Sequence, residues 1–461
     1  MIKNHRKKEN GKMRKTGKWM GLAVVAAMAL TACGSAGNSK QPASGEVKTE
    51  AGNEAEAESK SSSTGKKDLI IYNCAGASEY HEDIVAKKFQ EKYEDKYNVK
   101  IESLSASDVV SKIEAQGFEK GKGNVNIVIM GDSEVPNGLK AGIFADLSDY
   151  EEEFHTADLS DISKAAYEKM DNSVVPIMLG ISHGAICYNP STEAGAALDK
   201  VVGDDNSITY DELKDFMMND PSKPVMGRGR LTNSGPGDYW TWGLLQKFGE
   251  YGEDAEPTKS IEWAKDLYEN GKVAIYGSTS ATFKDLGEGS VDLIPHSTSW
   301  YYRLYALGKA KDTLPEDLQV DSFGLENTKL AYMDDENMTD LITGHFYTIP
   351  ANLSDEDMEA SKEYIEFAIS PEINSLSYAS LMQPAFTYSS LSKVEDEKIL
   401  TVWNEVSKYW PERYTVEKDG MKQIGLAEGR KWEFSISDVN LISKYGNAWK
   451  EQLEANVSET K

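Results

Sequence analysis

The sequence predicts an α/β fold in which helices cover largely parallel sheets, in a chain long enough for two domains. The chain has 461 residues, of which 39% are hydrophobic and 27% charged, so it can bury a normal core. Apolar runs typical of buried strands alternate with stretches whose apolar side chains recur at helical spacing. Short loops separate them, and this order of elements is typical of a parallel sheet.

The alternation begins after residue 68. Residues 69–74, 99–104 and 126–130 are predicted strands, and helical patterns at 80–93 and 109–117 separate them. Small and polar residues follow each strand. Ligands of open α/β sheets bind beyond the carboxyl ends of strands, although each of these residues alone is more typical of a turn or cap. The candidate ligand-binding residues here are Ala77, Ser78, Glu79, Ser105, Asp132 and Ser133.

The second half of the chain continues the same mixture. Thr209 and Glu212 form a capping box, which predicts a helix start. Pro371 ends an amphipathic helix at 354–369, and residues from 399 onward place aromatic side chains on helical faces. The remaining expected elements are apolar stretches at 174–179 and 185–188, helices at 239–248 and 261–270, and a strand at 291–295.

Two segments add further ligand-binding candidates. Ser234 and Asp238 precede a helix, and the free amides of a helix start can bind anions or hydroxyl groups, although simple capping explains them equally well. Aromatic rings can stack on sugars or attract cations, although any single ring is more often core. The aromatic candidates are Tyr239, Trp240, Trp300 and Tyr301.

The first 66 residues are predicted to direct and tether the chain. A basic segment (residues 1–18) and a short apolar run (20–30) precede Leu30-Thr31-Ala32-Cys33-Gly34, which resembles the bacterial lipobox. Residues 1–32 are therefore expected to be a lipoprotein signal peptide, with Cys33 the site of lipid (palmitate-type) attachment. Residues 33–66 lack aromatic side chains and read as a disordered tether to a membrane.

Charge and composition exclude several classes. The net charge of −26 disfavours a nucleic-acid partner, which would need a basic surface. Three cysteines cannot make a disulfide scaffold, and Cys74 and Cys187 are expected to be two buried thiols rather than a bonded pair. Six scattered histidines give no metal-binding motif, and the sequence indicates neither a cofactor nor a metal.

The order of motifs resembles the extracellular solute-binding proteins of bacterial ABC importers, a broad class that includes sugar, polyamine and iron binders. The resemblance runs from residue 68 to about 450. Five weak motifs in order carry it: residues 126–132, 143–147, 175–176 with 187–190, 346–350 and 370–372.

This resemblance implies a two-lobe periplasmic-binding-protein-like fold with a hinge. It places lobe 1 at 67–178 and 344–385, lobe 2 at 179–343, and C-terminal helices, mostly of lobe 2, at 386–461. It also implies a monomeric, non-enzymatic receptor on the outer face of the cell membrane. That receptor closes on a small polar solute and delivers it to the permease subunits of an ABC transporter.

The aromatic candidates favour a carbohydrate, with a polyamine, an organic anion or a ferric chelate as alternatives. An enzyme is an alternative from a different class of protein. Residues 180–184 fit G-x-S-x-G, which would make Ser182 the nucleophile of a surface α/β hydrolase, although a β-like stretch follows where a helix is needed. An interlobe crossing is the preferred interpretation, with His183 a further candidate for the cleft. An adhesive scaffold without a ligand is a third possibility.

Overall fold

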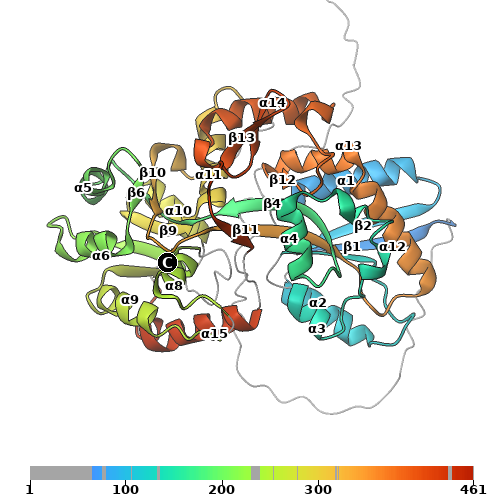
Figure 1. Ribbon diagram of the computed structural model, residues 1–461, viewed down its shortest axis with the longest axis horizontal. Coiled ribbons are helices and arrows are strands. Elements are labelled where there is room, and N and C mark those ends of the chain that lie inside the picture. The colour runs from blue at the N-terminus through green and yellow to red at the C-terminus, as the bar shows by residue number, and fades with distance from the viewer. Residues whose placement is uncertain are drawn as a thin grey trace, which may run out of the picture.

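The computed structural model shows two α/β lobes joined by strands that run from one to the other (Figure 1). Each lobe has its own mixed sheet with helices on both faces. The structure describes residues 65–74, 79–104, 106–131, 135–229, 239–252, 254–277, 279–316, 319, 321–434 and 439–459.

The sheet of lobe 1 is built around β1, whose Leu69 and Ile71 are completely buried. Strand β1 pairs in parallel with β2 and β3, and β11 lies antiparallel between β3 and β4. The three strands predicted from the first apolar runs are confirmed. The strands of this sheet are β1 (Lys67–Asn73), β2 (Tyr97–Ser103), β3 (Ile127–Gly131), β4 (Val175–Ser182), β11 (Asp340–Thr348), β12 (Gln383–Pro384) and β15 (Trp432–Phe434).

Helices close the core of lobe 1 on both faces of its sheet. Phe89 on α1 packs against Tyr97 and Tyr364, with ring centroids 5.4 and 5.0 Å apart. The predicted helix at 354–369 is confirmed as α12, because Ser354 caps it by accepting a hydrogen bond from the Asp357 amide. The helices of this lobe are α1 (Glu79–Lys92), α2 (Ala106–Gln116), α3 (Val135–Lys140), α4 (Asp161–Lys169), α12 (Asp355–Ala368) and α13 (Pro371–Asn374).

Lobe 2 has a sheet in the order β6-β10-β5-β9-β7-β8. Strand β5 pairs antiparallel with both β9 and β10, while β7 runs parallel to β8 and β9. Its strands are β5 (Gly184–Tyr188), β6 (Ser207–Ile208), β7 (Met226–Gly229), β8 (Val273–Tyr276), β9 (Leu293–Ser297) and β10 (Lys329–Met333).

The helices of lobe 2 begin where the sequence signals place them. Thr209 and Glu212 form the predicted capping box at the start of α6. Within the described ranges, no helix is both long and apolar enough to cross a membrane. The helices are α5 (Glu193–Val202), α6 (Tyr210–Asn219), α8 (Tyr239–Phe248), α9 (Lys259–Glu269), α10 (Thr279–Gly287), α11 (Thr298–Ala310) and α15 (Val439–Trp449).

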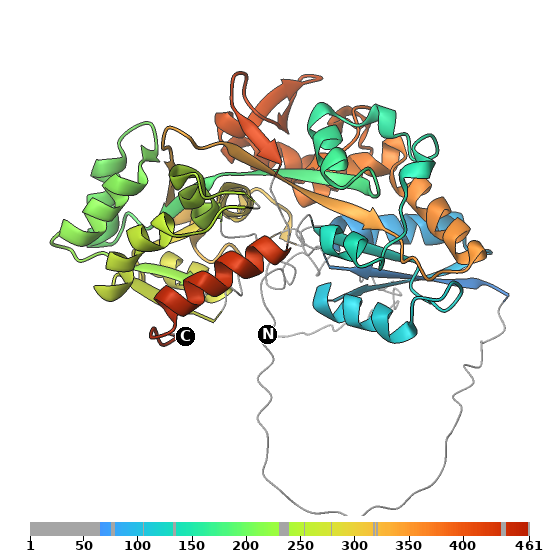
Figure 2. The same cartoon turned by 60° about the horizontal axis from the view of Figure 1, so that its bottom comes forward.

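Two of the passages of the chain between the lobes are closely spaced crossings. In the first, β4 of lobe 1 continues into β5 of lobe 2, and only His183 separates them. In the second, residues 334–339 join β10 of lobe 2 to β11 of lobe 1. The two crossings lie side by side and form the hinge region (Figures 1 and 2).

The C-terminal segment spans both lobes and contains more than helices. Helix α14 (Glu397–Val406) packs against α11, the hairpin β13–β14 (Thr415–Lys418 and Met421–Ile424) lies near the crossings, and β15 extends the lobe 1 sheet (Figure 2). The chain then returns to lobe 2, where Trp449 is completely buried. Asp419 and Gly420, both with positive φ, form the hairpin turn. An Asp-Gly pair is a hairpin signal, but the helical spacing of aromatic residues in this segment had indicated helices instead.

Candidate functional site

The candidate loops of lobe 1 leave its sheet at a single edge. Strands β1, β2 and β3 are parallel, so Asn73, Ser103 and Gly131 end them at the same side. Gly131 pairs with His345 on β11, five residues from the hinge end of that antiparallel strand. The loops therefore start on the side that faces lobe 2. Glu79 opens α1, whereas Ala77, Ser78, Ser105, Asp132 and Ser133 lie outside the described residues.

Lobe 2 shows the mirror arrangement. Strand β9 ends at Ser297, which pairs with Gly184, the residue after the hinge. Strands β7 and β8 run parallel to β9 and so end at the same edge, at Gly229 and Tyr276. The carboxyl ends of β1, β2 and β3 in lobe 1 and of β7, β8 and β9 in lobe 2 therefore face the space between the lobes. Ligands of α/β proteins bind at such ends. The candidates Ser234 and Asp238 lie outside the described residues.

The aromatic candidates lie on two separate helices. Tyr239 and Trp240 begin α8, whereas Trp300 and Tyr301 lie in the first turns of α11. Trp240 is 1% exposed and packs against Tyr210 and Trp263, with centroids 5.3 and 6.0 Å away. Tyr301 is also 1% exposed, and Tyr239 is 6% exposed. In this arrangement of the lobes, these three rings contribute to the core.

Arg228 is a buried cation at the lobe 2 edge that no sequence motif indicates. It lies one residue before the end of β7 and is 2% exposed. Its guanidinium carbon lies 5.9 Å from the ring centroid of Trp240 and 5.4 Å from that of Trp449. Its Nη2 also contacts the hydroxyl of Thr241 at 3.3 Å. An arginine held in this way places positive charge near the interlobe end of β7.

His183 occupies the hinge itself. It lies between the two sheets, because Ser182 is the last residue of β4 and Gly184 the first of β5. The imidazole is 1% exposed. Its Nε2 lies 2.8 Å from the carbonyl of Met333 and 3.5 Å from Asp334, and its Nδ1 lies 3.0 Å from Asp340. The side chain of this candidate therefore contacts the second crossing.

Two arginines from the C-terminal segment complete the hinge cluster, which we define as His183, Asp334, Asp340, Arg413 and Arg430. Arg413 donates to both carboxylate oxygens of Asp334, at 2.9 and 3.2 Å, and Arg430 donates to Asp340. The hydroxyl of Tyr414 also donates to Asp340, at 2.9 Å. No motif along the chain indicates this cluster, because its members are widely separated in sequence.

The ionisation of the cluster follows from these contacts. Burial opposes ionisation of Asp340, but His183 and Arg430 outweigh it and lower the pKa of Asp340 to about 2. The pKa of Asp334 lies well below its usual range, because His183 and Arg413 outweigh its burial. Burial disfavours protonation of His183, but Asp334 and Asp340 raise its pKa above the usual value. The cluster is therefore a set of mutually stabilised charges.

The hydrolase alternative is wrong for Ser182. A nucleophile elbow needs a strand followed by a helix, with an accessible serine on the turn between them. Here Ser182 is 1% exposed, ends β4 and is followed by β5. Residues 180–184 are part of an interlobe crossing, the interpretation that the β-like stretch after them favours.

Cys74 and Cys187 are not joined in a disulfide, although only Cys187 is fully buried. Burial raises the pKa of the Cys187 thiol well above its usual value, so the group stays protonated. Within the part of the chain that the structure describes, no group of three or more His, Cys, Asp or Glu side chains could hold a metal ion.

Two α/β lobes, joined at a hinge and with both sheet edges directed at the space between them, define a two-lobe binding protein. Residues 85–399 match the family described as bacterial extracellular solute-binding protein, and the chain belongs to this family. Its members are non-enzymatic proteins that bind small-molecule substrates for ABC transporters, and the family implies a location outside the cytoplasm.

Solved structures share the fold at low identity. A cyclic α-maltosyl-1,6-maltose binding protein from Arthrobacter globiformis is 15% identical, with a TM-score of 0.51 over 86% of this chain and 95% of its own. An ABC transporter protein from Clostridium perfringens is 13% identical, with a TM-score of 0.53 over 85% of this chain and 100% of its own. The acarbose-binding GacH receptor of Streptomyces glaucescens is 14% identical, with a TM-score of 0.51 over 85% of this chain and 100% of its own. A search of curated proteins gave no significant match.

Proposed function

We propose that the protein is a lipid-anchored receptor that captures a small polar solute by closure of its two lobes and delivers it to an ABC importer permease. The observation that carries this proposal is the orientation of the sheets. The carboxyl ends of β1, β2 and β3 face those of β7, β8 and β9 across a hinge. Rotation about the hinge would bring both sets of loops onto one ligand.

Within this function we propose a carbohydrate as the solute. Aromatic residues lie in the first turns of α8 and α11, and α11 directly follows the interlobe end of β9. Tyr239, Trp240 and Tyr301 are core residues in this arrangement, but aromatic rings that a movement of the lobes exposes can stack on the apolar faces of sugars. Two of the similar structures are described as binding sugars or acarbose. A polyamine, an organic anion or a ferric chelate is the alternative. The buried cation Arg228, near the interlobe end of β7, favours the organic anion among these.

Thermal unfolding of the purified protein against sugars, polyamines, carboxylates and ferric complexes tests the ligand class. A solute at about a thousand times its Kd should stabilise the folded state by about 4 kcal/mol, which raises the unfolding midpoint by several degrees. We expect one chemical class, the sugars, to do so.

Variants locate the binding site in the same assay. Asp132→Ala and Asp238→Ala each remove a polar group from one lobe's candidate loop and should reduce the shift. Asp312→Ala, an exposed residue after α11, is the matched control and should leave it unchanged. A panel without any shift, or a shift untouched by both loop variants, would contradict the proposed site.

Attachment through Cys33 is tested by metabolic labelling with a radioactive fatty acid. We expect the wild-type protein to incorporate label and to partition into detergent, because two acyl chains give stable anchoring. Cys33→Ser should lose both properties. Cys74→Ser controls for thiol loss and should keep them, and labelling that persists in Cys33→Ser would exclude the anchor.

A further inference from the structure

We propose that His183 is a proton-dependent latch: its imidazolium holds the lobes in the arrangement of this structure, and loss of its proton frees rotation about the hinge. This deepens the proposed function, since it names what regulates lobe closure and takes its biological meaning from that closure. His183 lies at the hinge. It is the one residue between β4 of lobe 1 and β5 of lobe 2.

The partners of the imidazole mark both ends of the other crossing. Asp334 directly follows β10 of lobe 2, and Asp340 is the first residue of β11 of lobe 1. Nε2 is directed toward the lobe 2 end, where it meets the Met333 carbonyl at 2.8 Å and Asp334 at 3.5 Å. Nδ1 lies 3.0 Å from Asp340 at the lobe 1 end. A rotation that displaces the lobe 2 end of this crossing relative to its lobe 1 end changes at least one of these distances.

The chemistry of these partners favours a doubly protonated ring. A carbonyl oxygen and an ionised carboxylate can only accept hydrogen bonds, and a neutral imidazole carries one N–H. A neutral His183 would therefore direct a lone pair at an acceptor on one side. The named carboxylates, Asp334 and Asp340, already pair with Arg413 and Arg430. Deprotonation thus removes a bridge between the two ends of the crossing without breaking these two ion pairs.

The remaining charged and titratable groups around the ring are consistent with a switch. Tyr332 lies edge-on, with ring centroids 6.4 Å apart, and the positive charge of Arg413 opposes protonation of His183. Tyr414 and Arg430 reach the ring through Asp340. Because the pKa of His183 is raised in the folded chain, its stabilising contribution is complete below about pH 6.5. That contribution disappears as the pH rises through the raised value.

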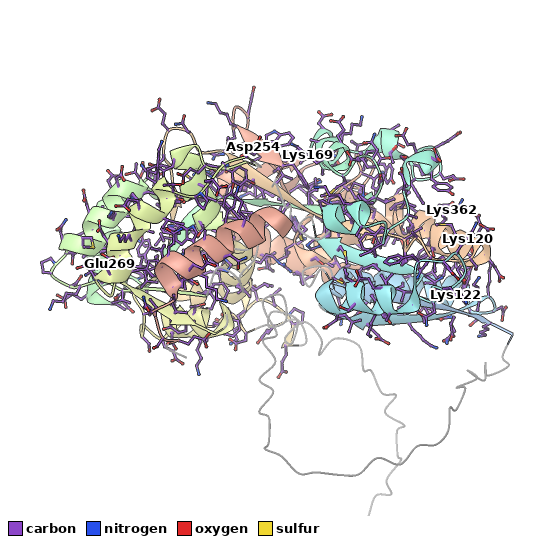
Figure 3. All side chains as sticks on the ribbon, turned by 90° about the horizontal axis from the view of Figure 1, so that it is seen from below. Lys120, Lys122, Lys169, Asp254, Glu269 and Lys362 are labelled. Atoms are coloured by element: carbon purple, nitrogen blue, oxygen red, sulfur yellow. The ribbon has the colours of Figure 1, made fainter. Side chains whose placement is uncertain are left out.

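Energy transfer between dyes on the two lobes tests the latch without any ligand, so its failure is distinguishable from failure of the solute-binding proposal. Lys122 and Glu269 are exposed on different lobes (Figure 3) and can carry dyes through non-natural amino acids, which leaves the cysteines untouched. We expect a narrow distribution centred on the distance in this structure at pH 5.5. At pH 8.5, we expect a broadened or second population.

Three variants assign that response. His183→Gln should show the same distribution at both pH values, whereas His155→Gln, an exposed histidine of lobe 1, should behave as wild type. Asp334→Asn keeps the imidazole but removes one carboxylate that raises the pKa of His183. The pH at which the distance distribution broadens should therefore be lower in this variant. This variant also provides a test if His183→Gln fails to fold. A wild-type distribution that ignores pH, or an unmoved transition in Asp334→Asn, would overturn the proposal.

Discussion

Glu82 lies completely buried on α1, where the hydroxyls of Tyr347 and Tyr364 donate to its carboxyl oxygens at 2.8 and 3.4 Å. Burial raises the pKa of Glu82 to about 8, and the two hydrogen bonds only partly oppose that shift. In the unfolded chain the same carboxyl titrates near 4.5. The folded state therefore keeps a proton that the unfolded state has lost between these two pH values. As the pH rises through this window, the stability contributed by Glu82 falls.

Glu82→Gln should remove this dependence. The amide cannot ionise, so we expect the variant to lose less stability than wild type between pH 5 and pH 8, by an amount on the order of a few kcal/mol. Urea unfolding at the two pH values measures the difference. Glu114→Gln, on an exposed position of α2, should leave the pH dependence unchanged. Equal pH dependence in wild type and Glu82→Gln would show that Glu82 is ionised when folded.

The hinge cluster shows, also at the residue scale, what one sequence cannot reveal. Nothing near His183 along the chain distinguishes it, because its carboxylate partners lie about 150 residues later and their arginines later still. Only the topology, in which β4 and β11 pair antiparallel at the hinge, brings them together. The sequence did single out His183, but as a residue of the cleft and without its partners.

Local signals predicted individual elements well. The capping box at Thr209 gave the start of α6, and Ser354 gave that of α12, because each hydroxyl satisfies a free amide within its own helix. The strands of the C-terminal segment were missed. In residues 421–424 burial alternates only weakly, and the pairing partner of β15 is β11, far away in sequence. The Asp419-Gly420 turn was the one local clue.

A matched pair of caps tests the element scale directly. Thr209 accepts a hydrogen bond from the Glu212 amide at 3.2 Å, whereas Thr258, the corresponding residue of α9, makes no side-chain capping bond. Thr209→Ala should therefore cost about 1 kcal/mol of stability, or about 2 °C in the unfolding midpoint. Thr258→Ala should be nearly neutral. Equal losses in calorimetry would mean that the capping bond contributes nothing at Thr209.

At the scale of the whole molecule, the two-lobe architecture and the direction of both sheet edges agree with the sequence-based expectation. The positions of the ring side chains could not be predicted in the same way. Helical spacing puts Trp240 and Tyr301 on some face of a helix, but whether that face meets the sheet or the interlobe space depends on packing between distant segments. The family match supports the same class of function as the fold.

The interleaving of the lobes has a consequence for how the protein is made. Strand β3 pairs with β11, which is synthesised more than two hundred residues later. Strand β15 joins the same sheet only near residue 434. A chain emerging in order from the ribosome therefore cannot complete lobe 1 until almost all of it has been synthesised. Pairing across such separations is intrinsically slow. For a family whose members work outside the cytoplasm, this delay would help keep the chain unfolded until export. An unfolded chain can pass through a membrane channel that a folded domain cannot enter.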